Sequence, residues 1–182
     1  ILDTDVTVKS LFGKQEGAVV GYNPHKPGRP SHAYHTYQIA GLRLMLGVTV
    51  APGNQSQANT TLPGLIELIE GLPQDKRPAL VRGDCGQGGE PTMAALEARG
   101  IRYLFKLRLT KNVKRYIERM FATPEWADAG QGWQGRDGSI QLTGWSRARR
   151  IVILRRALQG EVLLADAQQL SLAFVEKDVP AK

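Results

Sequence analysis

The sequence predicts an α/β fold built on a mixed β-sheet, and two observations carry this prediction. In roughly the first fifty residues, short stretches that alternate between apolar and polar side chains recur between turn-rich segments, which is typical of antiparallel strands joined in a meander. After residue 61 the order becomes helix, strand, helix, strand, and a strand-helix-strand unit places its two strands parallel through a right-handed crossover. The sheet is therefore expected to be antiparallel at first and parallel later, flanked by helices.

The antiparallel part is expected to contain four strands. In the first of them, alternation puts Asp3, Asp5 and Thr7 on one side of the strand. A loop over residues 23–31, rich in Pro, Gly and basic side chains, is expected to be exposed. The four expected strands cover residues 1–10, 18–22, 34–40 and 44–50.

The parallel part begins with a helix, because apolar residues recur at helical spacing from Leu62 to Ile69 and Gly71 ends the pattern. A short apolar strand is predicted over residues 79–82. The next helix has Pro91 in its first turn and Gly100 as its stop, which are the positions that these residues favour. The expected segments after the first helix are a strand at 79–82, a helix at 90–99 and a strand at 101–107.

The last third of the chain has a different character. Asn112 is a candidate cap for a further amphipathic helix. After Phe121, three tryptophans stand among Gly-rich turns, with strands expected at 139–144, 150–155 and 161–165. We therefore expect a core over residues 1–122 and a β-rich insertion over residues 123–182.

The composition restricts the partners and the compartment. The chain has 24 Lys and Arg against 17 Asp and Glu, a formal net charge of +7 and a pI near 9.8, which makes a polyanion a plausible partner. Cys85 is the one cysteine, so no disulfide can form within the chain, and the cytoplasm fits best. No apolar run approaches the roughly 20 residues that span a bilayer, so no membrane partner is expected.

Two sets of carboxylates are candidates for chemistry. Asp3 and Asp5 share one face of the first strand, and a regular element would hold them rigidly, as a hard-cation site requires. Asp84 follows the strand 79–82, and ligands of open α/β sheets bind outside the carboxyl ends of strands. The alternative interpretations are an ordinary solvent face for the first strand and a turn Asp bonded to its own backbone for Asp84.

Several short sequence blocks follow one another along the chain, namely LDTDVT at residues 2–7, GKQEGA at 13–18, GYNP at 21–24, VRGD at 81–84, LE at 96–97 and GIRYLF at 100–105. In their order and spacing, these blocks resemble the DDE transposases of group 1. The resemblance covers roughly residues 1 to 125 and rests on the order of the blocks, since each one is short.

This resemblance implies an RNase H-like fold and a function in DNA transposition. Members of the family use three carboxylates to bind two Mg²⁺ or Mn²⁺ ions for strand cleavage and strand transfer at insertion-sequence ends. By the resemblance, Asp5 is the first carboxylate and Asp84 the second, with Asp3 as an additional candidate ligand. The expected partners are terminal-repeat and target DNA and, in the full-length protein, a second copy. The expected location is the nucleoid in the bacterial cytoplasm.

The third acid of the family is a Glu within a motif that also contains Tyr, Arg and Lys, and this motif is not found here. Glu176 lacks that context. The chain opens at Ile1 and stops after Lys182 without an obvious terminal element, so we expect a fragment whose third acid lies beyond Lys182 and which is inactive alone.

Other interpretations remain open. A non-catalytic nucleic-acid-binding remnant and an RNase H-like nuclease are the alternatives to a transposase. Cys85 as a nucleophile would need a base, and a His32/His35 metal pair is disfavoured because alternation points the two rings to opposite faces of a strand. The Gly86–Gly89 segment lacks the spacing of a nucleotide fingerprint. The candidate phosphate contacts are Lys106, Arg108, Lys111, Lys114, Arg149 and Arg150.

Overall fold

The computed structural model describes residues 1–157 with the exception of 24–25, 43 and 56. The chain divides into two compact units, Ile1–Arg108 and Leu109–Lys182. This division lies earlier than the one expected after residue 122, because the helix that follows Arg108 packs with the strands after it. The functional division into core and insertion stays a prediction. The expected strand at 161–165 and Glu176 lie outside the described residues.

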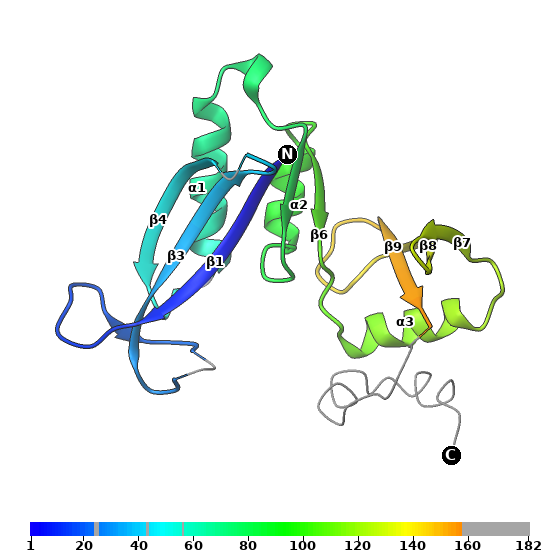
Figure 1. Cartoon of the computed structure of the whole chain (residues 1–182), viewed down its shortest axis with the longest axis horizontal. Coiled ribbons are helices and arrows are strands. Elements are labelled where there is room, and N and C mark those ends of the chain that lie inside the picture. Colours follow the sequence, from blue (N-terminus) through cyan, green and yellow to red (C-terminus); the bar gives the residue numbers. More distant parts are fainter. Residues whose placement is uncertain (24–25, 43, 56, 158–182) are drawn as a thin grey trace. The chain divides into compact units, whose positions relative to one another are not determined.

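The first unit contains a mixed sheet, as predicted. Its strands follow the order β2-β3-β1-β5-β6, with β4 paired to β3. The pairs β1·β3, β2·β3 and β3·β4 are antiparallel, whereas β1·β5 and β5·β6 are parallel. This is the arrangement of an RNase H-like sheet (Figure 1). The strands are β1 (Leu2–Ser10), β2 (Val19–Val20), β3 (Pro30–Ile39), β4 (Leu44–Pro52), β5 (Leu80–Gly83) and β6 (Arg102–Phe105).

The helices of this unit are α1 (Gln57–Gly71), the short 3₁₀ helix η1 (Gln74–Lys76) and α2 (Glu90–Glu97). Helix α1 starts earlier than its apolar periodicity indicates, because its first turn is polar. The helices bury their apolar side chains against one face of the sheet, and each fully buried aliphatic side chain contributes roughly 1.5–3 kcal/mol. The core consists of Leu2, Tyr37, Leu65, Ile69, Val81, Leu96 and Ile101.

The two faces of the sheet differ in what covers them. Leu2 and Thr4 of β1 are buried on the helix side, whereas Asp3 and Asp5 alternate onto the other face. We call this second face the open face, because neither α1 nor α2 packs on it. At the β4 edge the open face carries apolar side chains that are about half exposed, namely Met45 (46%), Val48 (50%) and Val50 (51%).

Two buried polar side chains fasten α1 to the sheet. His35 of β3 is fully buried, and its Nδ1 lies 2.6 Å from the Thr61 hydroxyl. Tyr37 donates its hydroxyl proton to the Thr61 carbonyl oxygen at 2.9 Å. Gly64 allows this close approach, since a Cβ there would lie 2.6 Å from the Tyr37 hydroxyl. Burial lowers the pKa of His35, so the imidazole is neutral in the folded protein.

In the residues that the structure describes, 109–157, the second unit is a helix with a three-stranded antiparallel meander, in the order β7-β8-β9. Thr110, and not Asn112, caps the helix, because its hydroxyl accepts the Val113 N–H. The guanidinium of Arg155 lies 5.0 Å from the Phe121 ring centre and 3.9 Å from that of Trp126. The elements are α3 (Lys111–Phe121), β7 (Ala127–Gly130), β8 (Trp133–Ile140) and β9 (Arg149–Arg156).

No helix in the described part of the chain has both the length and the apolar character required to cross a membrane.

Stability is expected to fall below about pH 6.5, the ordinary histidine value, because His35 is buried in its neutral form. The unfolded chain binds a proton there that the folded chain does not, so stability rises with pH up to that value and is lost as the pH falls. The slope from this group is at most about 1.4 kcal/mol per pH unit. Urea unfolding between pH 5 and pH 7.5 measures it, and His35→Gln should flatten the profile. The partly exposed His32 is the control, and an equally flattened profile for His32→Gln would contradict the assignment.

Gly64→Ala is expected to destabilise the protein by roughly 1–3 kcal/mol, because the added methyl group would overlap the Tyr37 hydroxyl at 2.6 Å and press on the Thr49 hydroxyl at 3.2 Å. Thermal or urea unfolding measures the loss. Gly71→Ala is the matched control at the end of the same helix, where a Cβ meets nothing within 4 Å. Equal stability of the two variants would mean that α1 does not approach β3 as closely as described.

Candidate active site

The parallel pairing of β1 with β5 brings two predicted site residues to neighbouring positions. Asp3 pairs with Arg82 and Thr4 with Gly83 in the register of these strands. Asp5 and Asp84 each stand one residue further along, at the carboxyl end of β5. Both side chains are exposed. Two carboxylates from distant parts of the sequence therefore stand at neighbouring positions, Asp5 within β1 and Asp84 just after the carboxyl end of β5.

Asp3 is engaged by a partner from the neighbouring strand. Arg82 donates from Nε to one carboxylate oxygen and from a terminal nitrogen to the other, each at 2.7 Å. These hydrogen bonds to the guanidinium hold the pKa of Asp3 below its ordinary value, against the opposing effect of partial burial. A bidentate pair of this kind uses both oxygens of the carboxylate. Asp3 is therefore placed to orient the strands, and a metal-binding role for it stays a prediction that this geometry does not favour.

The loop after β5 orients Asp84. The Oδ1 of Asp84 accepts the Gly86 N–H at 2.9 Å, and the carbonyl oxygen of Asp84 accepts the Gln87 N–H at 3.3 Å. This is the backbone-bonded turn that the alternative interpretation expected. The turn and a site at the strand end are compatible, because the bond fixes the direction of the carboxylate.

Gln87 is a residue that the sequence argument missed. Its side chain is buried, at 3% exposure, although Asp84, Cys85 and Gly86 before it are exposed. A Cβ at Gly83 would lie 2.8 Å from Gln87 Cγ and 3.1 Å from Thr4 Cγ2, so these three residues pack closely. Thr4 and Gly83 immediately precede Asp5 and Asp84. The signal in the sequence is slight: Gln87 is the one large side chain among the glycines of residues 86–89.

Metal ligands are limited in the part of the chain that the structure describes. There, no group of three or more His, Cys, Asp or Glu side chains is arranged to hold an ion. Asp5 and Asp84 supply oxygen donors, which suit Mg²⁺ and Mn²⁺. These two carboxylates thus fit the hard cations that the resemblance implies. They are two of the three acids that the family uses.

The two histidines that the structure describes, His32 and His35, do not form a metal pair. In the β1·β3 register, His32 lies opposite Lys9 and His35 opposite Val6, so their rings occupy opposite faces of the sheet. His32 Nε2 lies 2.9 Å from the Glu16 carbonyl oxygen, and His35 is buried under α1. Cys85 is an exposed free thiol.

The six candidate phosphate contacts differ in exposure. Lys106, Arg108, Lys111 and Arg150 are exposed, and Lys114 is partly buried. Arg150 pairs with Asp137 at 2.7 Å. Arg149 is 6% exposed, with its guanidinium 5.2 Å from the Trp145 ring centre. A DNA contact by Arg149 stays a prediction, which the burial of this side chain does not favour.

Among solved structures, the chain is similar to the piggyBac transposase synaptic complex with hairpin DNA, with 13% identity and a TM-score of 0.48 over 97% of this chain and 37% of that one. The chain is also similar to the Mos1 mariner paired-end complex with Mn, with 13% identity and a TM-score of 0.38 over 66% of this chain and 47% of that one. A third similar structure is the simian T-cell lymphotropic virus intasome in complex with the PP2A regulatory subunit B56 gamma. Here the identity is 13% and the TM-score 0.36, over 66% of this chain and 36% of that one. The chain spans between about a third and a half of the length of these chains.

No curated protein sequence matches the chain. The model of the family described as transposase DDE domain, group 1, matches residues 1–166. This match includes both exposed carboxylates, the strands that carry them and all of the second unit that the structure describes. The chain belongs to the transposase DDE domain group 1 family.

Proposed function

We propose that this chain is the part of a DDE transposase that carries the first two catalytic carboxylates, Asp5 and Asp84, and that the whole protein cleaves and joins DNA at insertion-sequence ends. The observation that carries the proposal is the β1·β5 register, which puts the two acids one residue beyond the Thr4–Gly83 pair. Membership of the family supports the reaction class. Neighbouring positions on adjacent strands are what a jointly held metal ion requires.

Asp5 and Asp84 would act as oxygen ligands for Mg²⁺ or Mn²⁺. When bound, the metal ions activate the attacking hydroxyl and stabilise the leaving oxygen. The chain's own contribution is to hold the carboxylates in place. The Gly86 N–H aims Asp84, and the Asp3–Arg82 pair fixes β1 against β5. The described residues supply two acids and no third one beside them, so the chain alone should bind metal weakly and carry out no strand transfer.

DNA is the proposed partner, and phosphate contact is the proposed mode. Basic side chains that are exposed and near strand or helix ends can neutralise phosphates without reading bases. Lys106 and Arg108 follow β6, and Lys111 opens α3. We propose that these positions hold DNA in register with the site, which leaves sequence recognition to other segments of the full-length protein, a proposed homodimer.

The strongest alternative function is an RNase H-like nuclease that cleaves without joining. It uses the same pair of carboxylates, so the position of Asp5 and Asp84 supports it equally. The match to the transposase family over residues 1–166 favours transposition. An assay that follows both cleavage and joining of terminal-repeat DNA by the full-length protein distinguishes the two.

Mn²⁺ is expected to bind weakly between Asp5 and Asp84. Titration of the labelled chain should broaden the NMR signals of amides near these two residues first, because a paramagnetic ion relaxes nearby nuclei. Asp84→Asn should remove the effect by taking away one charged ligand. Asp75→Asn is the matched control, since Asp75 is 71% exposed and pairs with Lys76. Broadening centred elsewhere, or unchanged in Asp84→Asn, would refute the proposed site.

Duplex DNA of arbitrary sequence is expected to bind with an affinity that falls steeply with salt. Replacing Lys106 and Arg108 by Ala should weaken binding similarly for every sequence and reduce the slope of log K against log salt by up to about two. Fluorescence anisotropy between 50 and 300 mM NaCl measures this. Salt-independent affinity, or no binding at the lowest salt, would remove DNA contact from the function of this chain.

A further inference from the structure

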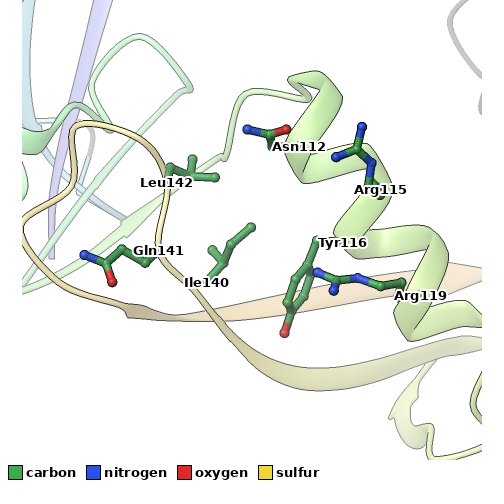
Figure 2. A pocket seen from close by; sticks show the side chains of 7 residues that line it. All are labelled: Asn112, Arg115, Tyr116, Arg119, Ile140, Gln141 and Leu142. Atoms are coloured by element: carbon green, nitrogen blue, oxygen red, sulfur yellow. The ribbon is translucent and has the colours of Figure 1, made fainter.

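We propose that a groove in the second unit, between α3 and the segment after β8, binds the phosphodiester backbone of a DNA strand. This inference rests on the proposed function and adds a binding site to it. Figure 2 shows the groove, with side chains from α3 on one wall and residues 140–142 on the other. Its lining consists of Asn112, Arg115, Tyr116, Arg119, Ile140, Gln141 and Leu142.

The arginines give the groove its charge. Arg115 and Arg119 stand one turn apart on α3, so both guanidinium groups lie along the same wall. No carboxylate is among the lining residues. A guanidinium presents a planar fork of N–H donors that matches the oxygens of a phosphate. The charge and the donor geometry therefore both favour a phosphate.

The wall is ordered before a ligand arrives. Tyr116 accepts the Ser139 N–H at 3.1 Å, and its hydroxyl lies where a Cβ at Gly138 would be only 2.4 Å away. Arg119 lies over the Tyr116 ring at 5.5 Å from its centre. Because that ring is packed against β8 and covered by Arg119, we expect phosphate contact at this wall and no stacking of a base on Tyr116.

The size of the groove favours one unit of a polymer. Its volume is about 250 Å³, which is below the roughly 300–1,000 Å³ of sites that enclose a whole small molecule. Ile140, at 8% exposure, and the partly buried Leu142 supply an apolar floor for a sugar. Asn112 and Gln141 add amide donors from opposite walls. A chain of phosphates and sugars can extend beyond such an open groove in both directions.

Arg115→Ala with Arg119→Ala tests the site. Affinity of the chain for a random duplex, measured by anisotropy, should fall about tenfold or more at 100 mM salt, and the salt slope should decrease by about two. Lys76→Ala with Arg77→Ala removes the same net charge from the η1 segment of the other unit and should change the slope by much less. Equal effects of the two pairs would show that net charge alone acts, which overturns the proposal.

Asn112→Asp distinguishes binding of DNA in the groove from non-specific binding of DNA to the basic face of α3. A carboxylate in the first turn of α3 favours the helix, so the melting temperature should be kept or raised. The same carboxylate would repel a phosphate in the groove and should lower affinity several-fold. Asn54→Asp, on an exposed loop of the other unit, is the matched control. Unchanged affinity of Asn112→Asp would overturn the groove as the binding site.

The outcomes also separate this inference from the proposed function. If the unmodified chain binds no DNA, the proposed DNA contact fails. If it binds with the expected salt dependence and the groove variants bind equally well, the groove proposal alone fails. Polyglutamate carries negative charge without phosphate, so it should displace the duplex only at far higher concentration. Displacement at equal charge concentration would contradict phosphate recognition.

Discussion

The parallel pairing of β1 with β5 is the constraint on which the candidate active site depends. It joins segments that stand 79 residues apart at the Asp3–Arg82 contact. That ion pair is partly exposed, with side-chain exposures of 44% for Arg82 and 23% for Asp3, and solvent screening leaves such exposed pairs with little effect on stability. The buried neighbours Leu2 and Val81 therefore supply most of the stability of the pairing, while the ion pair fixes its register. Small shifts in this register would separate Asp5 from Asp84.

The local sequence pattern predicted the fold well because each strand and helix of the sheet region has its own signal within a few consecutive residues. The alternation of Asp3, Asp5 and Thr7 gave the face of β1, and the strand-helix-strand order gave the parallel strands. The strand β3 begins at Pro30, inside the expected loop, because pairing with β1 and β2 extends it past its apolar residues. Tertiary pairing of this kind has no local signal.

The contacts around the site were less accessible to sequence reasoning. Arg82 is an ordinary surface residue until β5 lies beside β1, and only then does it meet Asp3. Gln87 is buried because Gly83, which has no side chain, leaves room for it. This packing depends on the two residues meeting in the fold, and no sequence motif indicates it. Charge counting gave no sign that Arg149 is buried, since an arginine can bury its stem and stack on an aromatic ring such as Trp145.

The apolar edge of the open face has a consequence for how the isolated chain behaves at high concentration. Strand β4 carries no charged side chain along Leu44–Pro52, and in the described residues it pairs with β3 alone. Natural sheets protect such edges with lysines, bulges or covering segments, because free backbone groups beside exposed apolar side chains template pairing with another molecule. The described β4 has one bulge, where its register with β3 shifts between Tyr37 and Gln38, and no lysine. Met45, Val48 and Val50 supply those side chains here. We therefore expect edge-to-edge self-association through β4 to compete with the monomer as the concentration of the isolated chain rises.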